Sequence, residues 1–353
     1  MVRCLLALLV AAALSAPSWN DPRFVSVRDG INNNPASTWK AAIHSNIPYD
    51  NEESLRRLCG SKMDATLLRQ TANNKEPLGS DPVDNTAGQN GSRRLQNFAL
   101  NYDLRQIYPT VKSIGTIVNQ GSCGSCWAVS AITALTDNLG IATRSSSATN
   151  QRILSSQDAL ECYGAANQGC QGGPIHGAFI FAQTNGVVSG GDFGNFNVCK
   201  PYFLNTLVPS YGNAVAPSCK AYCPSSLFRT SYIQDKTYTN GYKFLVGNTV
   251  AETVVNMKTA IVNAGSIVVG IDVYSDFYYY KSGVYSRSGY GSSYVGGHAV
   301  KVVGWGYDAV SRKNFWTIAN SWGIYWGEKG FVRFEAGTNH CRIETWALQA
   351  ILK

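Results

Sequence analysis

The stretch Gln120-Gly-Ser-Cys-Gly-Ser-Cys-Trp127 places two cysteines just before a segment with helical patterning. The apolar residues of that segment are Ala128, Ile132, Leu135 and Leu139. Their spacing predicts an amphipathic helix with Cys126 in its first turn. The free N–H groups and the positive end of the dipole at a helix start favour a thiolate over a thiol, and the thiolate is the reactive form. We therefore expect Cys126 to be a nucleophile.

Three other residues have the side chains that a catalytic thiolate needs. His298 heads an apolar, strand-like run within Gly296–Gly306 and offers a base for the thiol proton. Asn320 follows another strand-like run and offers a side-chain oxygen to the imidazole. Gln120 offers a side-chain amide near the backbone N–H of Cys126, and two such donors suit an oxyanion hole. Together these residues predict nucleophilic attack on a carbonyl group.

In this order, the motifs around Cys126, His298 and Asn320 resemble those of the papain family of cysteine peptidases, and within it the cathepsin B branch. The likeness extends from about Trp39 to the C-terminus. The resemblance implies an α+β, papain-like fold of two lobes, one helical and one β-rich, with the active-site cleft between them. It implies a cysteine-type peptidase, and it implies no metal and no organic cofactor.

Other interpretations of the motifs are open. Cys123-Gly-Ser-Cys126 also fits a thioredoxin-like C-x-x-C or half of a zinc site. Neither explains His298, Asn320 and Gln120, and a redox role would require Cys170 to be free. Taken singly, His298 would be a structural histidine and Asn320 a turn residue. A catalytically silent binding protein on the same fold is the alternative from another class, but such relatives usually lose the nucleophile.

Composition and local patterning divide the chain into three parts. With 44% apolar and 15% charged residues in 353, the chain is typical of a well-packed globular protein. Residues 1–16 have the charged, apolar and small-residue regions of a secretory signal peptide. We expect residues 17–97 to be an inhibitory propeptide and residues 98–353 the catalytic domain, mainly helical over 98–230 and mainly β over 231–353.

The charge pattern limits the partners of the protein. The formal net charge of +8 is spread along the chain without a basic run, so nucleic-acid binding is not expected. No segment after the signal is long and apolar enough to span a bilayer. We expect a monomer in the secretory pathway, destined for the lysosome, the vacuole or the extracellular space. Its partners would be protein and peptide substrates and its own propeptide.

The expected propeptide carries helical patterning over Trp39–Ile43 and Glu53–Cys59, with Asp50 and Glu53 spaced as a capping pair. The segment Arg57-Leu-Cys-Gly60 resembles the cathepsin B propeptide, which blocks the cleft by running against the usual chain direction. An independent small domain is the alternative, but too little apolar sequence is available for its core.

Residues 71–94 are polar and rich in Asn, Gly, Ser and Asp, which is typical of a linker. They contain the glycosylation sequon Asn90-Gly-Ser92 and the pair Arg93-Arg94. A cleavable loop before Phe98 follows from this composition. A glycan on Asn90 would leave with the propeptide, so the mature enzyme would carry no N-linked glycan.

Ten cysteines in an exported chain indicate disulfides. Cys4 leaves with the signal and Cys59 lies in the propeptide, and setting aside Cys126 leaves seven, so at least one further thiol is free. The resemblance to cathepsin B implies the pairs Cys123–Cys170, Cys162–Cys219 and Cys199–Cys223, which leaves Cys341 unpaired.

Several elements of the expected catalytic domain follow from capping signals and apolar runs. The predicted helices are Ala159–Cys162 after the capping box Ser155–Asp158, Ile175–Thr184 before Asn185-Gly186, and Val250–Ala264 between Thr249 and Gly265. The predicted strands are Ile267–Val273, His298–Val303, Phe315–Ala319 and Phe331–Phe334.

Three residues are candidates for positions along the cleft. Gly172 and Gly173 lack side chains, so a substrate backbone could approach them closely, although a simple turn is the alternative. Trp322 would shield the contact between His298 and Asn320 from water, and an ordinary core tryptophan is the alternative.

Two departures from the cathepsin B pattern affect the expected specificity. Residues 200–218 contain no histidine, whereas the resemblance implies an occluding loop whose histidines bind the terminal carboxylate of the substrate. We therefore expect an endopeptidase, with a carboxydipeptidase as the alternative. Trp346 stands where the resemblance implies a glutamate, which favours apolar P2 side chains. If Trp346 instead packs inward, Ala299 and Gly270 line that pocket, and P2 arginine still lacks the glutamate.

Overall fold

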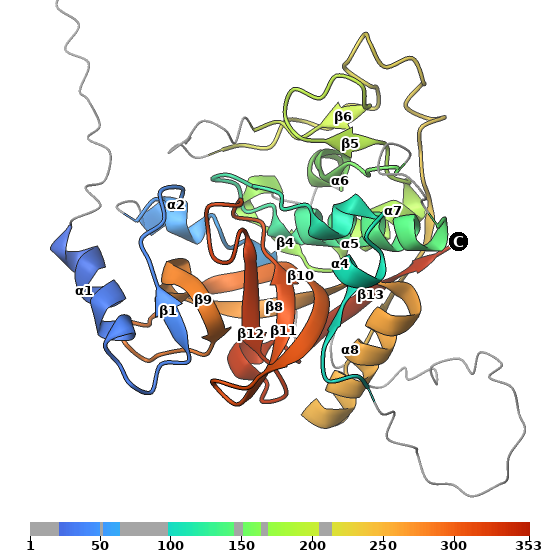
Figure 1. The fold of residues 1–353 in the computed structure, drawn as a ribbon. Coiled ribbons are helices and arrows are strands. Elements are labelled where there is room, and N and C mark those ends of the chain that lie inside the picture. The colour runs from blue at the N-terminus through green and yellow to red at the C-terminus, as the bar shows by residue number, and fades with distance from the viewer. Residues whose placement is uncertain (1–20, 50–51, 64–97, 145–150, 164–168, 205–213) are drawn as a thin grey trace, which may run out of the picture.

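The computed structural model describes residues 21–49, 52–63, 98–144, 151–163, 169–204 and 214–353 (Figure 1). The expected signal peptide, the capping residue Asp50, the linker over residues 71–94 and the sequon at Asn90 lie outside the described residues. In the described residues, no helix is both long and apolar enough to cross a membrane.

Three helices form one layer of the molecule, and the longest lies at its centre (Figure 1). They are α5 (Cys126–Ala142), α6 (Ser156–Cys162) and α7 (Gly177–Thr184). The prediction of an amphipathic α5 is wrong, because this helix is buried almost all round and even Thr136 and Asp137 are inaccessible. The reason is its position, since α5 packs on α6 and α7 as well as on the sheet.

A buried ion pair joins α5 to the sheet. Asp137 on α5 lies 2.8 Å from the ammonium of Lys301, which is three residues after His298 in the chain. The Asp137 carboxylate also accepts hydrogen bonds from the hydroxyls of Ser113 and Ser266. These contacts satisfy a buried charge, and they fix the helix that begins at Cys126 against the strand that carries His298.

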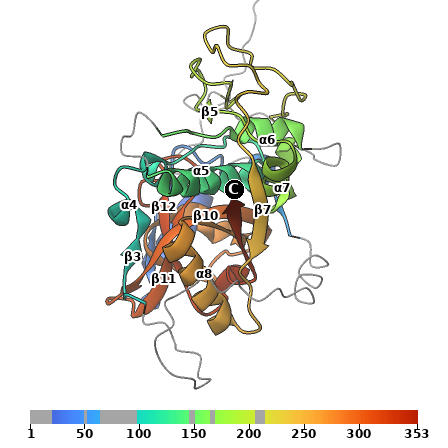
Figure 2. The same ribbon diagram turned by 90° about the vertical axis from the view of Figure 1, so that its right-hand side faces the viewer.

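Two helix starts match their sequence predictions. The hydroxyl of Ser155 accepts the N–H of Asp158 at 3.0 Å, and that of Thr249 accepts the N–H of Glu252 at 3.1 Å. The helix α8 (Val250–Ala264) ends as predicted at Gly265, which has a φ of 104°. It packs against the sheet strands, as Figure 2 shows.

Helix α7 begins at Gly177, two residues after the predicted start, because Gly173 and Pro174 form a short strand and the chain must then turn. The other short helical pieces are α4 (Leu104–Ile107) and the 3₁₀ turns η1 (Lys112–Gly115), η2 (Gly169–Gln171), η3 (Ser275–Tyr279) and η4 (His340–Arg342).

The second layer is a nine-stranded sheet in the order β1-β9-β12-β11-β10-β8-β13-β7, with β3 paired to β10. Its strands are β1 (Trp39–Ala41), β3 (Tyr102–Asp103), β7 (Thr239–Phe244), β8 (Ile267–Tyr274), β9 (Tyr280–Tyr285), β10 (Tyr294–Asp308), β11 (Lys313–Ala319), β12 (Phe331–Glu335) and β13 (Trp346–Leu352). Neighbours are antiparallel except β12 and β9. Helices in one layer and a sheet in the other make this a mixed α+β fold.

The four predicted strands are present as β8, β10, β11 and β12, and each is longer than predicted. The prediction that His298 heads a strand is wrong, because β10 already begins at Tyr294 and the glycines Gly296 and Gly297 pair with β8. His298 therefore lies inside a strand, and its backbone is paired with Ile271 of β8.

The N-terminal segment does not form a domain of its own. Its elements are α1 (Pro22–Asn32), β1, α2 (Glu52–Arg56) and β2 (Ser61–Lys62). The helix predicted over Trp39–Ile43 is wrong, because β1 pairs with β9 and buries alternate residues, Trp39 and Ala41. The buried side chains of the N-terminal segment, including Ile31, Ile47 and Trp39, belong to the same core as the sheet. Figure 1 shows α1 and β1 at one edge of the molecule.

The structure contains the three disulfides that the resemblance implied, Cys123–Cys170, Cys162–Cys219 and Cys199–Cys223. Among the described residues, the cysteines outside these pairs are Cys59, Cys126 and Cys341. Two short parallel pairs, β2 with β4 (Gly173–Pro174) and β5 (Gly190–Gly191) with β6 (Lys200–Pro201), complete the fold.

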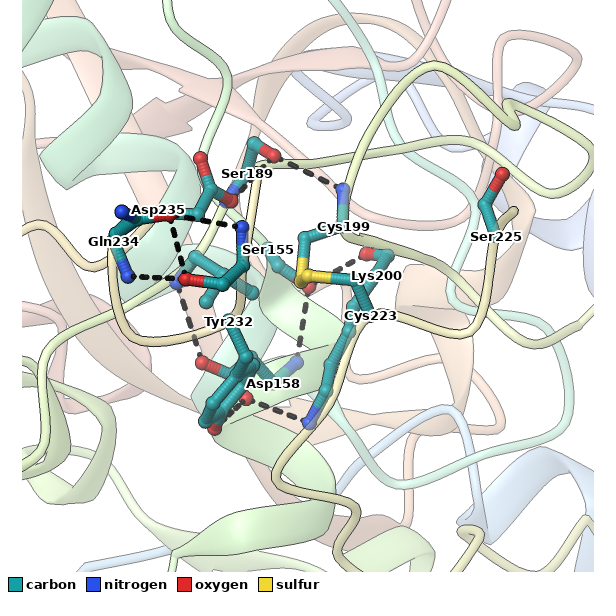
Figure 3. Close-up of a disulfide and its surroundings, with 12 residues drawn as sticks. Ser155, Asp158, Ser189, Cys199, Lys200, Cys223, Ser225, Tyr232, Gln234 and Asp235 are labelled. Carbon is teal, nitrogen blue, oxygen red and sulfur yellow. Dashed lines mark hydrogen bonds and ion pairs between the residues drawn. A yellow bond between two sulfur atoms is a disulfide. The ribbon is translucent and has the colours of Figure 1, made fainter. Parts of the chain in front are cut away.

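The disulfide between Cys199 and Cys223 lies beside a buried polar network (Figure 3). The ammonium of Lys200 pairs with Asp158 at 2.8 Å and with Glu161 at 2.6 Å. These charges satisfy one another, so the network joins β6 to α6.

Candidate active site

Cys126 is the first residue of α5 and is fully buried in the structure. Burial raises the pKa of its thiol to about 11, while hydrogen bonds with backbone groups of Ala299, Gly60 and Trp127 act in the opposite direction. Cys126 therefore lies between β10 and the N-terminal segment, since Ala299 follows His298 on β10 and Gly60 belongs to that segment. In this state Cys126 is a neutral thiol.

His298 is held by an amide on one side and an indole on its face. Its Nε2 lies 2.8 Å from Oδ1 of Asn320, and its ring stacks on Trp322 with centroids 5.0 Å apart. An amide oxygen only accepts, so Nε2 carries the proton and Nδ1 has a free lone pair. In the described part of the chain, Nδ1 has no hydrogen-bond partner. Burial lowers the pKa of His298 to about 4, so the ring is a neutral base.

Asn320 lies directly after β11 and is buried. Its Oδ1 also accepts the backbone N–H of Ser321 at 2.8 Å, which fixes the orientation of the amide. Trp322, two residues on, is 1% exposed and covers the ring of His298. Both side chains are thus placed by one turn of the chain.

Gln120 has a fixed amide orientation. Its Oε1 accepts the hydroxyl of Ser321 at 2.5 Å, so its Nε2 points to carbonyl oxygens, those of Cys123 at 2.8 Å and Leu58 at 3.3 Å. The indole N–H of Trp322 donates to the same Leu58 oxygen at 3.1 Å. Two donors therefore converge on one peptide carbonyl, two residues before Gly60, whose backbone bonds to Cys126.

Tyr202 is a supporting residue that the sequence reasoning missed. Its buried hydroxyl donates to the backbone oxygen of Gln120 at 3.0 Å and lies 2.7 Å from the hydroxyl of Ser125, the residue before Cys126. One side chain thus braces both the candidate oxyanion donor and the start of α5. A tyrosine after Lys200-Pro201 gives no sequence signal of this role.

Residues 58–63, which we call the cleft segment, lie over this site. The N–H of Gly173 donates to the oxygen of Gly60 at 2.9 Å, and β2 runs parallel to β4. Gly172 has a φ of 98°, and a Cβ there would come within 2.5 Å of the Gly60 oxygen. Both glycines proposed for the cleft thus lie against an extended peptide backbone, as their lack of side chains permits.

Met63 of the cleft segment occupies the place where we expected a substrate side chain. A Cβ on Gly270 would lie 2.6 Å from its sulfur, and one on Gly297 would lie 2.9 Å from its methyl carbon. Trp346 is fully buried and stands opposite Gly270 in the sheet, in the same apolar cluster as Ala299. Trp346 therefore packs inward, as the alternative interpretation had it.

The other three histidines make contacts of their own. His44 bonds to the carbonyl oxygens of Tyr280 and Tyr325, His176 stacks on Tyr242, and the Nε2 of His340 accepts the N–H of Arg287. In the described residues, none of these contacts is with Cys126 or His298.

A thiol at a helix start, a neutral imidazole fixed by an amide, and amide donors beside the thiol allow a sulfur nucleophile to attack a carbonyl carbon. This is the chemistry of a cysteine-type peptidase. The model of the papain family of cysteine proteases matches residues 98–351, so the chain belongs to that family.

Two of the curated relatives are cathepsin B-like cysteine proteinases. The chain is 39% identical over 254 residues to cathepsin B-like cysteine proteinase 3 of Caenorhabditis elegans, an alignment that covers 71% of the chain and 65% of that relative. It is 32% identical to proteinase 4 of the same organism, and that alignment covers 88% of each. The chain thus spans just under two thirds of the first relative and most of the second.

Solved structures share the fold. Procathepsin B S9 from Trypanosoma congolense superposes with a TM-score of 0.71 at 24% identity, covering 93% of this chain and 98% of that one. Digestive procathepsin L 3 of Tenebrio molitor gives a TM-score of 0.62 at 21% identity, with 94% of this chain and 88% of that chain covered. At these identities the likeness concerns the papain-like fold alone.

Proposed function

We propose that the chain is the precursor of a cathepsin B-like endopeptidase with Cys126 as its nucleophile. The observation that carries the proposal is the Leu58 carbonyl, which accepts hydrogen bonds from Gln120 and Trp322 in the segment whose Gly60 backbone bonds to Cys126. This contact supports the proposal, because Gln120 would donate in the same way to the carbonyl oxygen of a substrate.

The proposed reaction proceeds in two halves. His298 takes the proton of Cys126, and the sulfur attacks the carbonyl carbon while the oxyanion is held by Gln120 Nε2 and the Cys126 N–H. His298 then protonates the leaving amine, which yields a thioester. In the second half, His298 accepts a proton from water as it attacks the thioester, and the acid is released as Cys126 regains its proton. Asn320 keeps the imidazole oriented throughout.

The cleft segment accounts for an inactive precursor. It excludes water from Cys126 and His298, and burial makes both groups neutral. Its removal would hydrate both groups, so that the thiol pKa falls and the imidazole pKa rises. Proton transfer from Cys126 to His298 then becomes favourable at the start of α5.

Endopeptidase activity is the second part of the proposal. It rests on the lack of histidine in residues 200–218 and on the separate contacts of His44, His176 and His340. Without such histidines, a terminal carboxylate lacks the partner that the family resemblance implies, and internal bonds would be cut instead. A carboxydipeptidase would need another group for that carboxylate.

Apolar P2 residues are the third part. Met63 occupies the space beside Gly270, in the cluster that contains Ala299 and Trp346. An apolar side chain of similar length would bury against the same surfaces, with a favourable transfer free energy. We therefore propose leucine or methionine as the preferred P2 residue.

The division of the chain also remains our proposal, with a signal peptide over 1–16, a propeptide over 17–97 that carries Asn90, and a catalytic domain over 98–353. The helical part would extend over 98–230 and the β-rich part over 231–353. The mature enzyme would be a monomer in the lysosome, the vacuole or the extracellular space.

Mass spectrometry of the products from an unstructured peptide with a free C-terminus and several apolar P2 sites tests the function. Processed wild type is compared with Cys126→Ala, and Cys341→Ala serves as the matched control because it also loses a free thiol. We expect internal cuts by wild type and Cys341→Ala only. Dipeptides released from the C-terminus would contradict the endopeptidase proposal, and products with Cys126→Ala would contradict the nucleophile.

A further inference from the structure

Asp272 stands on the face of the sheet that the cleft segment covers. In the pairing of β8 with β10, Asp272 is opposite Gly297 and Gly270 is opposite Ala299. Residues that pair directly, and residues two apart in a strand, share a face. A Cβ on either glycine would contact Met63, so Asp272 shares the face on which Met63 lies. The side chain of Met63 thus occupies a pocket with a carboxylate beside it.

The carboxylate of Asp272 is buried without full satisfaction. Its side chain is 10% exposed, and its Oδ1 has no hydrogen-bond partner among the described residues. The guanidinium of Arg342 lies 3.7 Å away, beyond hydrogen-bond distance, on a side chain that is 48% exposed. Burial raises the pKa of Asp272, and Arg342 opposes that rise. A buried acceptor left short of donors is costly unless a ligand supplies one.

The pocket therefore combines two kinds of surface. The glycines and Ala299 provide apolar surface, and Asp272 provides an acceptor on the same face. A side chain with an aliphatic stem and a cationic head matches both, because the stem is buried and the head binds the carboxylate. Trp346 removes one acidic group from the family pattern, but Asp272 supplies another from a neighbouring strand.

We propose that Asp272 is a specificity-determining residue that allows the pocket beside Gly270 to accept arginine or lysine at P2 in addition to apolar residues. The inference rests on the proposed function and deepens it. Arg342 competes for the same carboxylate, so a basic side chain must displace it toward solvent. Apolar residues displace nothing, and for that reason they remain the preferred P2 class.

Peptides that differ only at P2, with leucine or arginine there, test the proposal on processed enzyme. Asp272→Asn keeps the size of the side chain and removes its charge. We expect it to lower kcat/KM for the arginine peptide by about tenfold or more, as for a lost charge-assisted hydrogen bond, and to leave the leucine peptide within about twofold. An unchanged kcat/KM of Asp272→Asn for the arginine peptide, relative to wild type, would overturn the proposal.

Arg342→Gln gives an independent measurement, since it removes the competing cation from a half-exposed side chain. It should raise kcat/KM for the arginine peptide severalfold without changing that for the leucine peptide. If Asp272→Asn impairs both peptides through misfolding, Arg342→Gln decides, and no rise would overturn the proposal. Failure of wild type to cleave even the leucine peptide would instead reject the proposed function, which keeps the two failures distinguishable.

Discussion

Two strands of the N-terminal segment pair with the rest of the chain, and they differ in pairing direction and in what they bury. β1 is antiparallel to β9 and buries Trp39 in the main core, where its indole N–H donates to the Ser286 oxygen at 2.8 Å. β2 is a two-residue parallel pair with β4, and its neighbour Gly60 packs on backbone. We therefore expect β1 to supply most of the binding free energy and the cleft segment to supply the inhibition.

The largest effect is expected from Trp39→Ala. It removes a fully packed aromatic side chain and one hydrogen bond, and should weaken docking of the N-terminal segment by about 3–5 kcal/mol. Peptidase activity of the uncleaved precursor would then appear without processing. Lys40→Ala, on the exposed side of the same strand, is the matched control and should leave the precursor inactive. If both variants stay inactive, β1 is not the anchor.

The next effect is that of pH on the cleft segment. Burial lowers the pKa of His298 from 6.5 to about 4 in the precursor, so the covered state binds fewer protons than the open state. The contribution of His298 to the stability of the covered state is therefore fully present above pH 6.5. It is lost progressively as pH falls toward 4, by about 3 kcal/mol. Labelling of Cys126 by iodoacetamide in the precursor should increase over that interval, after correction for the intrinsic pH dependence of a free thiol. A flat corrected profile would contradict this linkage.

A smaller effect is expected from a change beneath the cleft, which leaves the segment that covers it intact. Tyr202→Phe removes the hydroxyl that bridges Gln120 and Ser125, at a cost of about 1–2 kcal/mol. Because this residue positions others, we expect kcat to fall about tenfold while KM hardly changes. Tyr222→Phe, at an exposed tyrosine, is the control. An increase in KM alone would mean that Tyr202 acts on substrate binding instead.

The smallest effect is expected from Cys341→Ala. Burial raises the pKa of the Cys341 thiol to about 12, so this thiol is unreactive at neutral pH. Probe labelling of the processed enzyme should therefore be unchanged in Cys341→Ala and lost in Cys126→Ala, as peptide mapping of the labelled cysteine would show. Substantial label on Cys341 would mean that the labelling of Cys126 reports general thiol access.

Local patterns predicted the elements with local causes. Cys126 at the start of α5 and the capping roles of Ser155 and Thr249 depend on residues within one turn, and the structure has them. Trp39–Ile43 was predicted as a helix because its apolar residues fit helical and extended spacing alike, and only pairing with β9 selects the strand. The disulfide pairs came from the family resemblance, since spacing alone leaves many pairings open.

The contacts around the candidate site were harder to predict because they cross between strands. Asp272 reads as one polar residue in an apolar strand, and its place beside Gly297 depends on the register of β8 against β10. Likewise, Tyr202 and Leu58 both form hydrogen bonds with Gln120, although each lies 62 or more positions away from it in the chain. No periodicity in the sequence carries such information.

The buried pair of Asp137 and Lys301 has a consequence for the kinds of protein that can be cut. It ties the helix of Cys126 to the strand of His298, so we expect the two walls of the cleft to move together. A groove that cannot widen admits a single extended strand of polypeptide and rejects a folded surface. Proteins would then become substrates in proportion to how often a stretch of them unfolds locally.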